Sequence, residues 1–259
     1  MIDIDKAYKE FDKYVSNYNP EHPRIKLKTE HIKRVAKNSV KIAKDLGLSE
    51  EEVKLAELIG IFHDIGRFEQ VRIADTFSDK DSGINHAAIG VKVLFDDGLI
   101  RNFIEETKYD EIIRKAIINH NKAKIDDGLS EKELLFAKII RDADKLDIFF
   151  TTVYFEFEPL FWYHGFDQEE INPLIVKQIE NHELIHYDMI KNNADQIPIF
   201  YAYIYDLNFD SSLKTVVEGK YLDGYTERIK EHFTNPRVHE QSDYALKICH
   251  EFFKEKGLE

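Results

Sequence analysis

The chain has 259 residues, of which 43% are hydrophobic and 33% are charged, and its formal net charge at pH 7 is -13. This hydrophobic content excludes the compositions of disordered chains, which bury too little apolar surface to offset the entropy lost on folding. The acidic balance argues against binding of duplex nucleic acid, which relies on clustered Lys and Arg to neutralise phosphates. A small anionic substrate stays compatible with this charge, because bound divalent cations can invert the local potential.

The cysteine content and the first residues of the chain indicate the compartment. Cys249 is the single cysteine, so no intramolecular disulfide can form, which fits a reducing environment. Residues 1–6 carry charges where a signal peptide needs an apolar core, and no charge-free run is long enough to span a bilayer. We therefore expect a cytoplasmic protein that has no membrane partner.

Two consecutive helices are predicted in the first quarter of the chain. Apolar residues recur at three- and four-residue steps over 29–46, which is the spacing of one helix face, and Gly47 is typical of a helix stop. The run Ser49-Glu50-Glu51-Glu52 has the form of a capping box and predicts a second helix that continues to Phe62.

The second predicted helix ends at the dipeptide His63-Asp64, just before Gly66. Neighbouring residues of a regular helix point about 100° apart, so both side chains can reach one metal ion only where the helix ends or is distorted. We expect Gly66 to supply the freedom for that change of direction.

The remaining patterns predict a mainly α fold. Further helical periodicity is found over 87–95, 109–119 and 130–150, whereas 200–209 and 213–217 are compatible with a short hairpin or with more helix. No Pro-, Gly- or Ser-rich linker divides the sequence, so residues 1–259 are predicted to form a single globular unit. Within it we expect a helical core over 27–190 and a C-terminal extension over 191–259 packed on that core.

Six potential metal ligands lie at predicted helix ends or helix faces in the first 144 residues. They are His31, His63, Asp64, His86, His120 and Asp144. Imidazole and carboxylate ligands together favour one or two divalent transition-metal ions such as Mn, Fe, Ni, Co or Zn, whereas an oxygen-only set favours Mg or Ca.

The ordered pattern H…HD…H…H…D resembles the HD-domain superfamily of metal-dependent phosphohydrolases. The resemblance covers about residues 27–147 and is carried by the strings Thr29-Glu30-His31, Phe62-His63-Asp64-Ile65-Gly66-Arg67, Asn85-His86-Ala87-Ala88-Ile89-Gly90, Asn119-His120-Asn121 and Arg141-Asp142-Ala143-Asp144-Lys145-Leu146. It implies a helical bundle and a small phosphorylated substrate, with a nucleotide-type substrate favoured.

The resemblance also implies roles for the six ligands. It assigns one metal ion the ligands His31, His63, Asp64 and Asp144. In the two-metal branch of the family, His86 and His120 match the additional ligands, and Asp64 bridges the two ions. A binuclear metal centre of this kind activates water for hydrolysis.

Arg67 and Lys145 are the expected catalytic residues beside Asp64. Arg67 stands where related members that cleave cyclic dinucleotides often carry Lys, and a guanidinium there can bind phosphate oxygens. Lys145 is a candidate for the same work. Some one-metal nucleotidases of the family have Glu at the position of Arg67, and the cyclic-dinucleotide branch has a Gly-Tyr-Pro signature. This chain has neither feature, which argues against a simple nucleotidase of that type and leaves a cyclic dinucleotide substrate without support.

Two other functions stay open. A small branch of the superfamily has the same six ligands but uses a mixed-valence di-iron centre as an oxygenase on an organophosphonate or a cyclitol. We favour hydrolysis because it is the majority activity of the family, which is an argument by analogy. The other alternative is a non-catalytic metal-bound sensor or binding protein, whose hallmark is the loss of ligands, and all six are present here.

An aromatic run between Phe149 and Phe166, which includes Tyr163, has no assigned function. It is compatible with core packing, with a substrate pocket or with a homodimer interface, and core packing is favoured.

Overall fold

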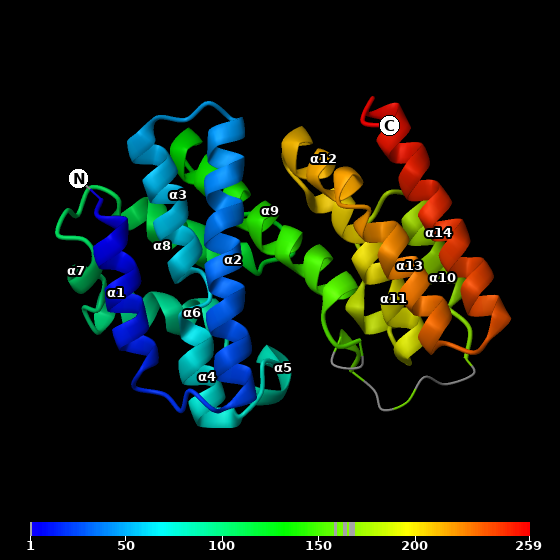
Figure 1. The fold of residues 1–259 in the computed structure, drawn as a ribbon, viewed down its shortest axis with the longest axis horizontal. Helices are drawn as coiled ribbons and strands as arrows, with labels where there is room; N and C mark the ends of the chain where they lie inside the picture. Colours follow the sequence, from blue (N-terminus) through cyan, green and yellow to red (C-terminus); the bar gives the residue numbers. More distant parts are fainter. Residues whose placement is uncertain (1, 158–159, 163–164, 166–168) are drawn as a thin grey trace. The chain divides into compact units, whose positions relative to one another are not determined.

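The structure is a computed structural model that describes residues 2–157, 160–162, 165 and 169–259. Within these residues every regular element is a helix and no strand occurs, which confirms the prediction of an all-α fold (Figure 1). The chain divides into two compact units, Met1–Asp147 and Ile148–Glu259. The sequence-based division stays a prediction. It places a helical core over 27–190 and an extension over 191–259 within a single globular unit. Two members of the aromatic run, Tyr163 and Phe166, lie outside the described residues.

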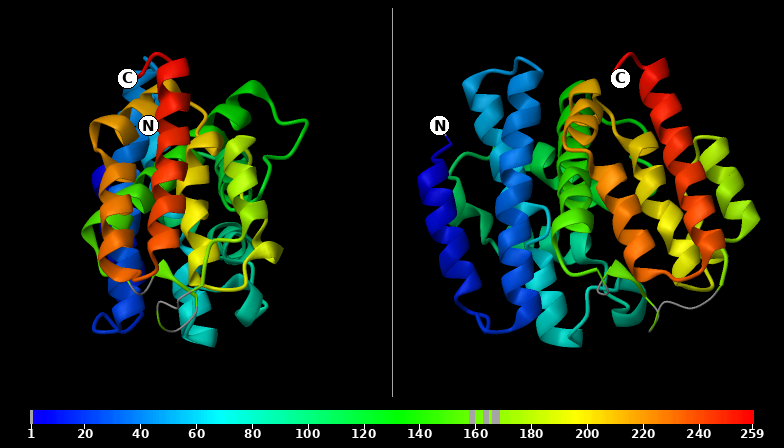
Figure 2. Two further views of the ribbon diagram at one scale, coloured as in Figure 1. Left: turned by 90° about the vertical axis from the view of Figure 1, so that its right-hand side faces the viewer. Right: turned by 45° about the vertical axis from the view of Figure 1, so that its right-hand side comes forward.

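The first unit contains the elements that carry the predicted ligands. Its elements are α1 (Ile4–Val15), α2 (Pro23–Asp45), α3 (Glu50–Phe62), α4 (Gly66–Ala74), α5 (Asp79–Ser82), α6 (His86–Val91), the π-helical η1 (Lys92–Asp96), α7 (Ile100–Phe103), α8 (Asp110–His120) and the part of α9 (Glu131–Tyr154) up to Asp147. The two helices α2 and α3 run side by side, as the views of Figure 2 show. Their facing sides are apolar and buried, so this pair forms the main packing layer of the unit.

The predicted helices are present, with two differences. The helix expected over 29–46 begins earlier, at Pro23, because proline suits the first turn of a helix and the side chain of His22 accepts a hydrogen bond from the Arg24 N–H. The helix expected over 87–95 is divided into α6 and η1. In η1 the Asp97 N–H bonds to the Lys92 carbonyl at 3.0 Å, which is the longer spacing of a π-helix.

The capping box predicted at the start of α3 is confirmed. The backbone N–H of Ser49 donates to Glu52 Oε2 at 3.1 Å, and the Ser49 hydroxyl donates to the same oxygen at 2.6 Å. We expect Ser49→Ala to lower the free energy of unfolding by about 1 kcal/mol, because helix N–H groups lose their cap. Urea denaturation followed by circular dichroism measures this change, and an unchanged midpoint would contradict the role given to the cap.

The second unit is helical throughout its described part. Its elements after α9 are α10 (Pro173–Glu180), η3 (Tyr187–Met189), α11 (Asn193–Ala202), η4 (Tyr203–Asp206), α12 (Asp210–Glu218), α13 (Tyr221–His232) and α14 (Pro236–Glu255). The ambiguous segments 200–209 and 213–217 are therefore mainly helix and contain no hairpin. The helix α11 is buried along almost its whole length, with α10 and α14 packed against it. Across the described residues, none of the helices has the length and apolar character that a membrane crossing requires.

Candidate metal centre

The dipeptide His63-Asp64 lies at a break between two helices. The His63 N–H still bonds to the carbonyl four residues earlier, at 2.9 Å, but the Ile65 N–H bonds to the Phe62 carbonyl, only three residues earlier, at 3.0 Å. The chain then changes direction and enters α4 at Gly66. The expectation that the helix ends at this pair is confirmed, and the break lets the two side chains face the same side.

Gly66 has a different role from the one predicted for it. The φ angle of Gly66 is not positive, so the residue supplies no unusual backbone conformation. A Cβ atom at Gly66 would lie 2.2 Å from the His86 carbonyl oxygen and 2.5 Å from the Gly90 nitrogen. The missing side chain therefore allows α4 to pack directly on α6, which fixes the position of His86 relative to Asp64.

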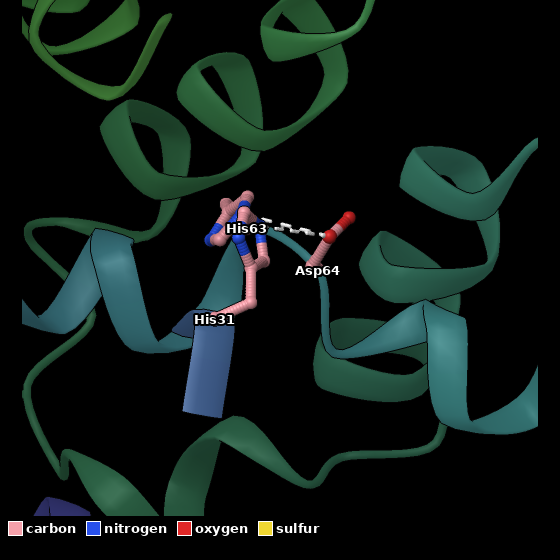
Figure 3. Close-up of side chains that lie close together, drawn as sticks. All are labelled: His31, His63 and Asp64. Carbon is pink, nitrogen blue, oxygen red and sulfur yellow. Dashed lines mark hydrogen bonds and ion pairs between the residues drawn. The ribbon is translucent and has the colours of Figure 1, made fainter. Parts of the chain in front are cut away.

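The first group of potential ligands is formed by His31 from α2 together with His63 and Asp64 (Figure 3). The Nε2 atoms of the two histidines are 3.2 Å apart. Asp64 Oδ2 lies 3.4 Å from His31 Nε2 and 3.6 Å from His63 Nε2. Asp144 on α9 lies beside this group, with its Oδ1 3.2 Å from His31 Nε2 and 3.8 Å from His63 Nε2. Four side chains from three parts of the sequence thus lie close together.

The second group uses the other oxygen of Asp64. Asp64 Oδ1 lies 3.4 Å from Nε2 of His86 at the start of α6 and 3.6 Å from Nε2 of His120 at the end of α8. The two imidazole nitrogens are 3.1 Å apart. The structure thus brings all six predicted ligands together, with Asp64 between a pair of histidines on each side.

The four histidines share one orientation. In each, Nδ1 lies within hydrogen-bond distance of an acceptor oxygen. The pairs are His31 with Asp147 at 2.7 Å, His63 with the Gly60 carbonyl at 2.7 Å, His86 with Asp79 at 2.7 Å and His120 with the Ile117 carbonyl at 2.6 Å. An imidazole that donates from Nδ1 can present the Nε2 lone pair to a metal ion.

The chemistry of the second group suits a metal ion. Burial lowers the pKa of His86 to about 4, so its ring is neutral at pH 7. Its Nε2 lies 3.1 Å from Nε2 of His120. The buried Asp64 Oδ1 lies beside both nitrogens and has no hydrogen-bond partner within the described part of the chain. Two imidazole nitrogens and a carboxylate oxygen in such close contact form a donor set that fits a divalent transition metal.

The first group differs in its protonation. Burial lowers the pKa of His63 to about 3. Burial and Lys28 also act to lower the pKa of His31, but its hydrogen bonds to Asp144, Asp147 and Asp64 outweigh them and raise it to about 10. A metal ion that binds this group must therefore displace a proton from His31 at neutral pH.

The predicted catalytic Arg67 is held by neighbours of the second group. Its Nη1 donates to Asp79 Oδ1 at 2.9 Å and to Gln70 Oε1 at 2.7 Å, and its Nε lies 3.4 Å from Asp64 Oδ1. Asp79 also accepts from His86, so this carboxylate connects the guanidinium to a ligand. Lys145, the other predicted catalytic residue, follows Asp144 on α9 and is buried. Its catalytic role stays a prediction.

Three residues that contact the ligands were missing from the sequence-based set. Lys28 precedes His31 by three residues on α2, and Asp147 follows Asp144 by three residues on α9. Helical spacing could have indicated both, because residues three apart share a helix face. Asp79 begins the short helix α5 and reaches its partner only through the tertiary fold, so no local pattern marks it.

These observations define the class of the first unit as a helical metal-binding domain with buried His and Asp ligands. Residues 29–148 match the model of the HD domain family, and the chain therefore contains an HD domain, which confirms the resemblance. Proteins with this domain are mostly metal-dependent hydrolases. Neither a curated protein nor a solved structure matches the chain.

Proposed function

We propose that this HD domain hydrolyses a small phosphoester or phosphoanhydride, with a nucleotide-type substrate, at a centre of two divalent transition-metal ions. The observation that carries the proposal is the position of Asp64, whose two oxygens each face a separate pair of histidine nitrogens. One carboxylate shared in this way suits two cations a short distance apart. Mn, Fe, Ni, Co and Zn are the candidate ions, because each accepts imidazole and carboxylate ligands.

Each ion has its own set of ligands in this proposal. The first set is His31, His63, Asp64 and Asp144, and the second is Asp64, His86 and His120. Ions held there would lower the pKa of a coordinated water and neutralise charge on a phosphoryl group.

Residues around the ligands support hydrolysis in other ways. Asp147 and Asp79 hold the rings of His31 and His86 with Nε2 directed inward. Arg67 keeps a positive charge beside Asp64, where it can stabilise negative charge on a phosphoryl group. Lys145 is proposed to contribute a second positive charge beside Asp144.

The test combines metal analysis with a substrate screen. Protein purified without oxygen is analysed for bound metal and then assayed for phosphate release from nucleotides, dinucleoside polyphosphates and sugar phosphates with Mn, Fe, Ni or Co. Turnover of a member of this panel supports the proposal. Substrate-dependent oxygen uptake with an iron-dependent paramagnetic signal would instead show a mixed-valence di-iron oxygenase. Absence of any turnover would indicate a non-catalytic sensor.

The two groups can be separated with a single substitution. His120→Ala removes a ligand of the second group and leaves the side chains of the first intact, so we expect the bound metal to fall from about two ions per chain to about one. The fold should persist, as measured by circular dichroism, because a buried ring replaced by alanine leaves the helices in place. The matched control is His250→Ala, a partly exposed histidine on α14 that should retain the full metal content. Equal metal content in both variants would contradict a second site.

A further inference from the structure

Lys28 makes the closest contact to Asp64 that the structure shows. It lies on α2 one turn before His31, and its Nζ is 2.6 Å from Asp64 Oδ2. The side chains of Lys28 and Asp64 are 15% and 4% exposed, so this ion pair is largely shielded from water. The ammonium also lies 5.2 Å from the centre of the Phe77 ring. An aromatic face next to the pair further favours a cation at this position.

The contact places a cation directly against a buried carboxylate. Burial opposes ionisation of Asp64, and Lys28 is the neighbour that most strongly lowers the pKa of its carboxyl. Of the other nearby cations, Arg67 approaches the opposite oxygen, Oδ1, only to 3.4 Å and is already bonded to Asp79. His31 faces Oδ2 as well, with its Nε2 3.4 Å away. At 2.6 Å, Lys28 is therefore the nearest counter-charge on the Oδ2 side, and a buried carboxylate without a counter-charge destabilises a folded protein.

The same oxygen is the one that the first metal ion requires. Asp64 Oδ2 faces the Nε2 atoms of His31 and His63, so a divalent cation held by these three atoms contacts the oxygen that Lys28 already contacts. Two cations on one carboxylate oxygen repel each other, and this repulsion is strong where water is excluded. Binding of the metal ion therefore weakens the contact between Lys28 and Asp64, and this contact in turn weakens binding of the metal ion.

We propose that Lys28 is the resident counter-cation of Asp64, which stabilises the domain before metal binds and gives up this contact to the incoming ion. Lys28 thereby lowers the affinity of the first metal group and keeps the ligands in place for metal to enter. This inference rests on the metal centre of the proposed function and is independent of the reaction catalysed there.

The first experiment measures metal affinity and stability in Lys28→Met, Lys28→Arg and the control Lys33→Met. Lys33 is on the same helix and pairs with the exposed Asp12. We expect Lys28→Met to bind Mn²⁺ at least about tenfold more tightly than the unaltered protein, because the competing charge is lost. Its melting temperature should fall without metal and recover when metal is added. Lys28→Arg and Lys33→Met should stay close to the unaltered protein.

A second measurement needs no variant and applies if Lys28→Met fails to fold. Lysine side chains of the unaltered protein are labelled by reductive methylation and the products are quantified by mass spectrometry, with Lys33 as the internal reference. We expect Mn²⁺ to raise the methylation rate of Lys28 several-fold relative to that of Lys33, since the ion pair that protects its amine is broken.

The outcomes separate this inference from the proposed function. If the unaltered protein binds no metal, the proposed function fails together with the metal centre. If it binds metal but Lys28→Met shows unchanged affinity, or the methylation of Lys28 does not respond to Mn²⁺, the inference on Lys28 is overturned while the metal centre stands.

Discussion

Replacement of Asp64 by asparagine is expected to lower metal-dependent phosphate release by at least about a thousandfold. Asn has nearly the same shape as Asp, but it has no negative charge and only one of its two terminal atoms can act as a ligand. Because Oδ1 and Oδ2 each face a different pair of histidines, this single change weakens both groups at once. Steady-state assays and the metal content of the purified variant measure the effect together.

The matched control for this prediction is Asp127→Asn. Asp127 is an exposed carboxylate paired with Lys124, so its substitution removes the same charge from the chain without touching the ligands. We expect it to retain full metal content and full turnover. A variant of Asp64 that keeps two metal ions per chain and normal turnover would show that the carboxylate is no bridge.

The sequence could predict where His63-Asp64 lies because this pair belongs to a local pattern. The capping box at Ser49 and the apolar periodicity that follows predict where α3 ends, and the position of His63-Asp64 follows from that end. The backbone break after Phe62 is a property of a few consecutive residues. Short-range signals of this kind do not depend on how the rest of the chain folds, so the helical fold class and the position of His63-Asp64 could be predicted.

The parts that sequence reasoning missed depend on contacts between distant segments. Lys28 meets Asp64 across 36 positions of the sequence, and Asp147 meets His31 across 116. Such pairs exist only once α2 and α9 have packed around the turn after α3. Helical spacing alone does not indicate which of the many charged residues will contact a ligand. Asp79 is only seven positions from His86, but their bond forms only when the short helix α5 folds back beside the start of α6, which helical spacing does not predict.

Gly66 shows how a correct residue can be given an incorrect reason. Glycine after a helix usually indicates unusual backbone freedom, and this pattern predicts a flexible turn. In the structure, Gly66 instead lies where two backbone segments touch, and any side chain larger than a hydrogen atom would clash there. Its φ angle is not in the positive range that favours glycine. Only the tertiary fold distinguishes these two uses of glycine, and they lead to different expectations for substitution.

Gly66→Ala is expected to destabilise the first unit by about 3 kcal/mol or more. The added methyl group would meet the His86 carbonyl oxygen and the Gly90 nitrogen, which are backbone atoms that cannot rotate away as a side chain can. Relief therefore requires α4 and α6 to separate, which also moves His86 away from Asp64. Urea denaturation should show the loss of stability, and titration with Mn²⁺ should show weaker binding by the variant than by the unaltered protein.

The opposite face of the same contact supplies the control. A Cβ at Gly90 would meet its nearest neighbour, the Gly66 nitrogen, at 3.4 Å, which is an ordinary van der Waals distance. Gly90 lies within α6, where alanine is the better helix former by about 1 kcal/mol, so Gly90→Ala should leave stability unchanged or slightly raised. Similar losses in both variants would mean that the α4–α6 interface tolerates no added volume anywhere. A loss confined to Gly66→Ala would locate the constraint in the approach of the Asp64 turn to the backbone that carries His86.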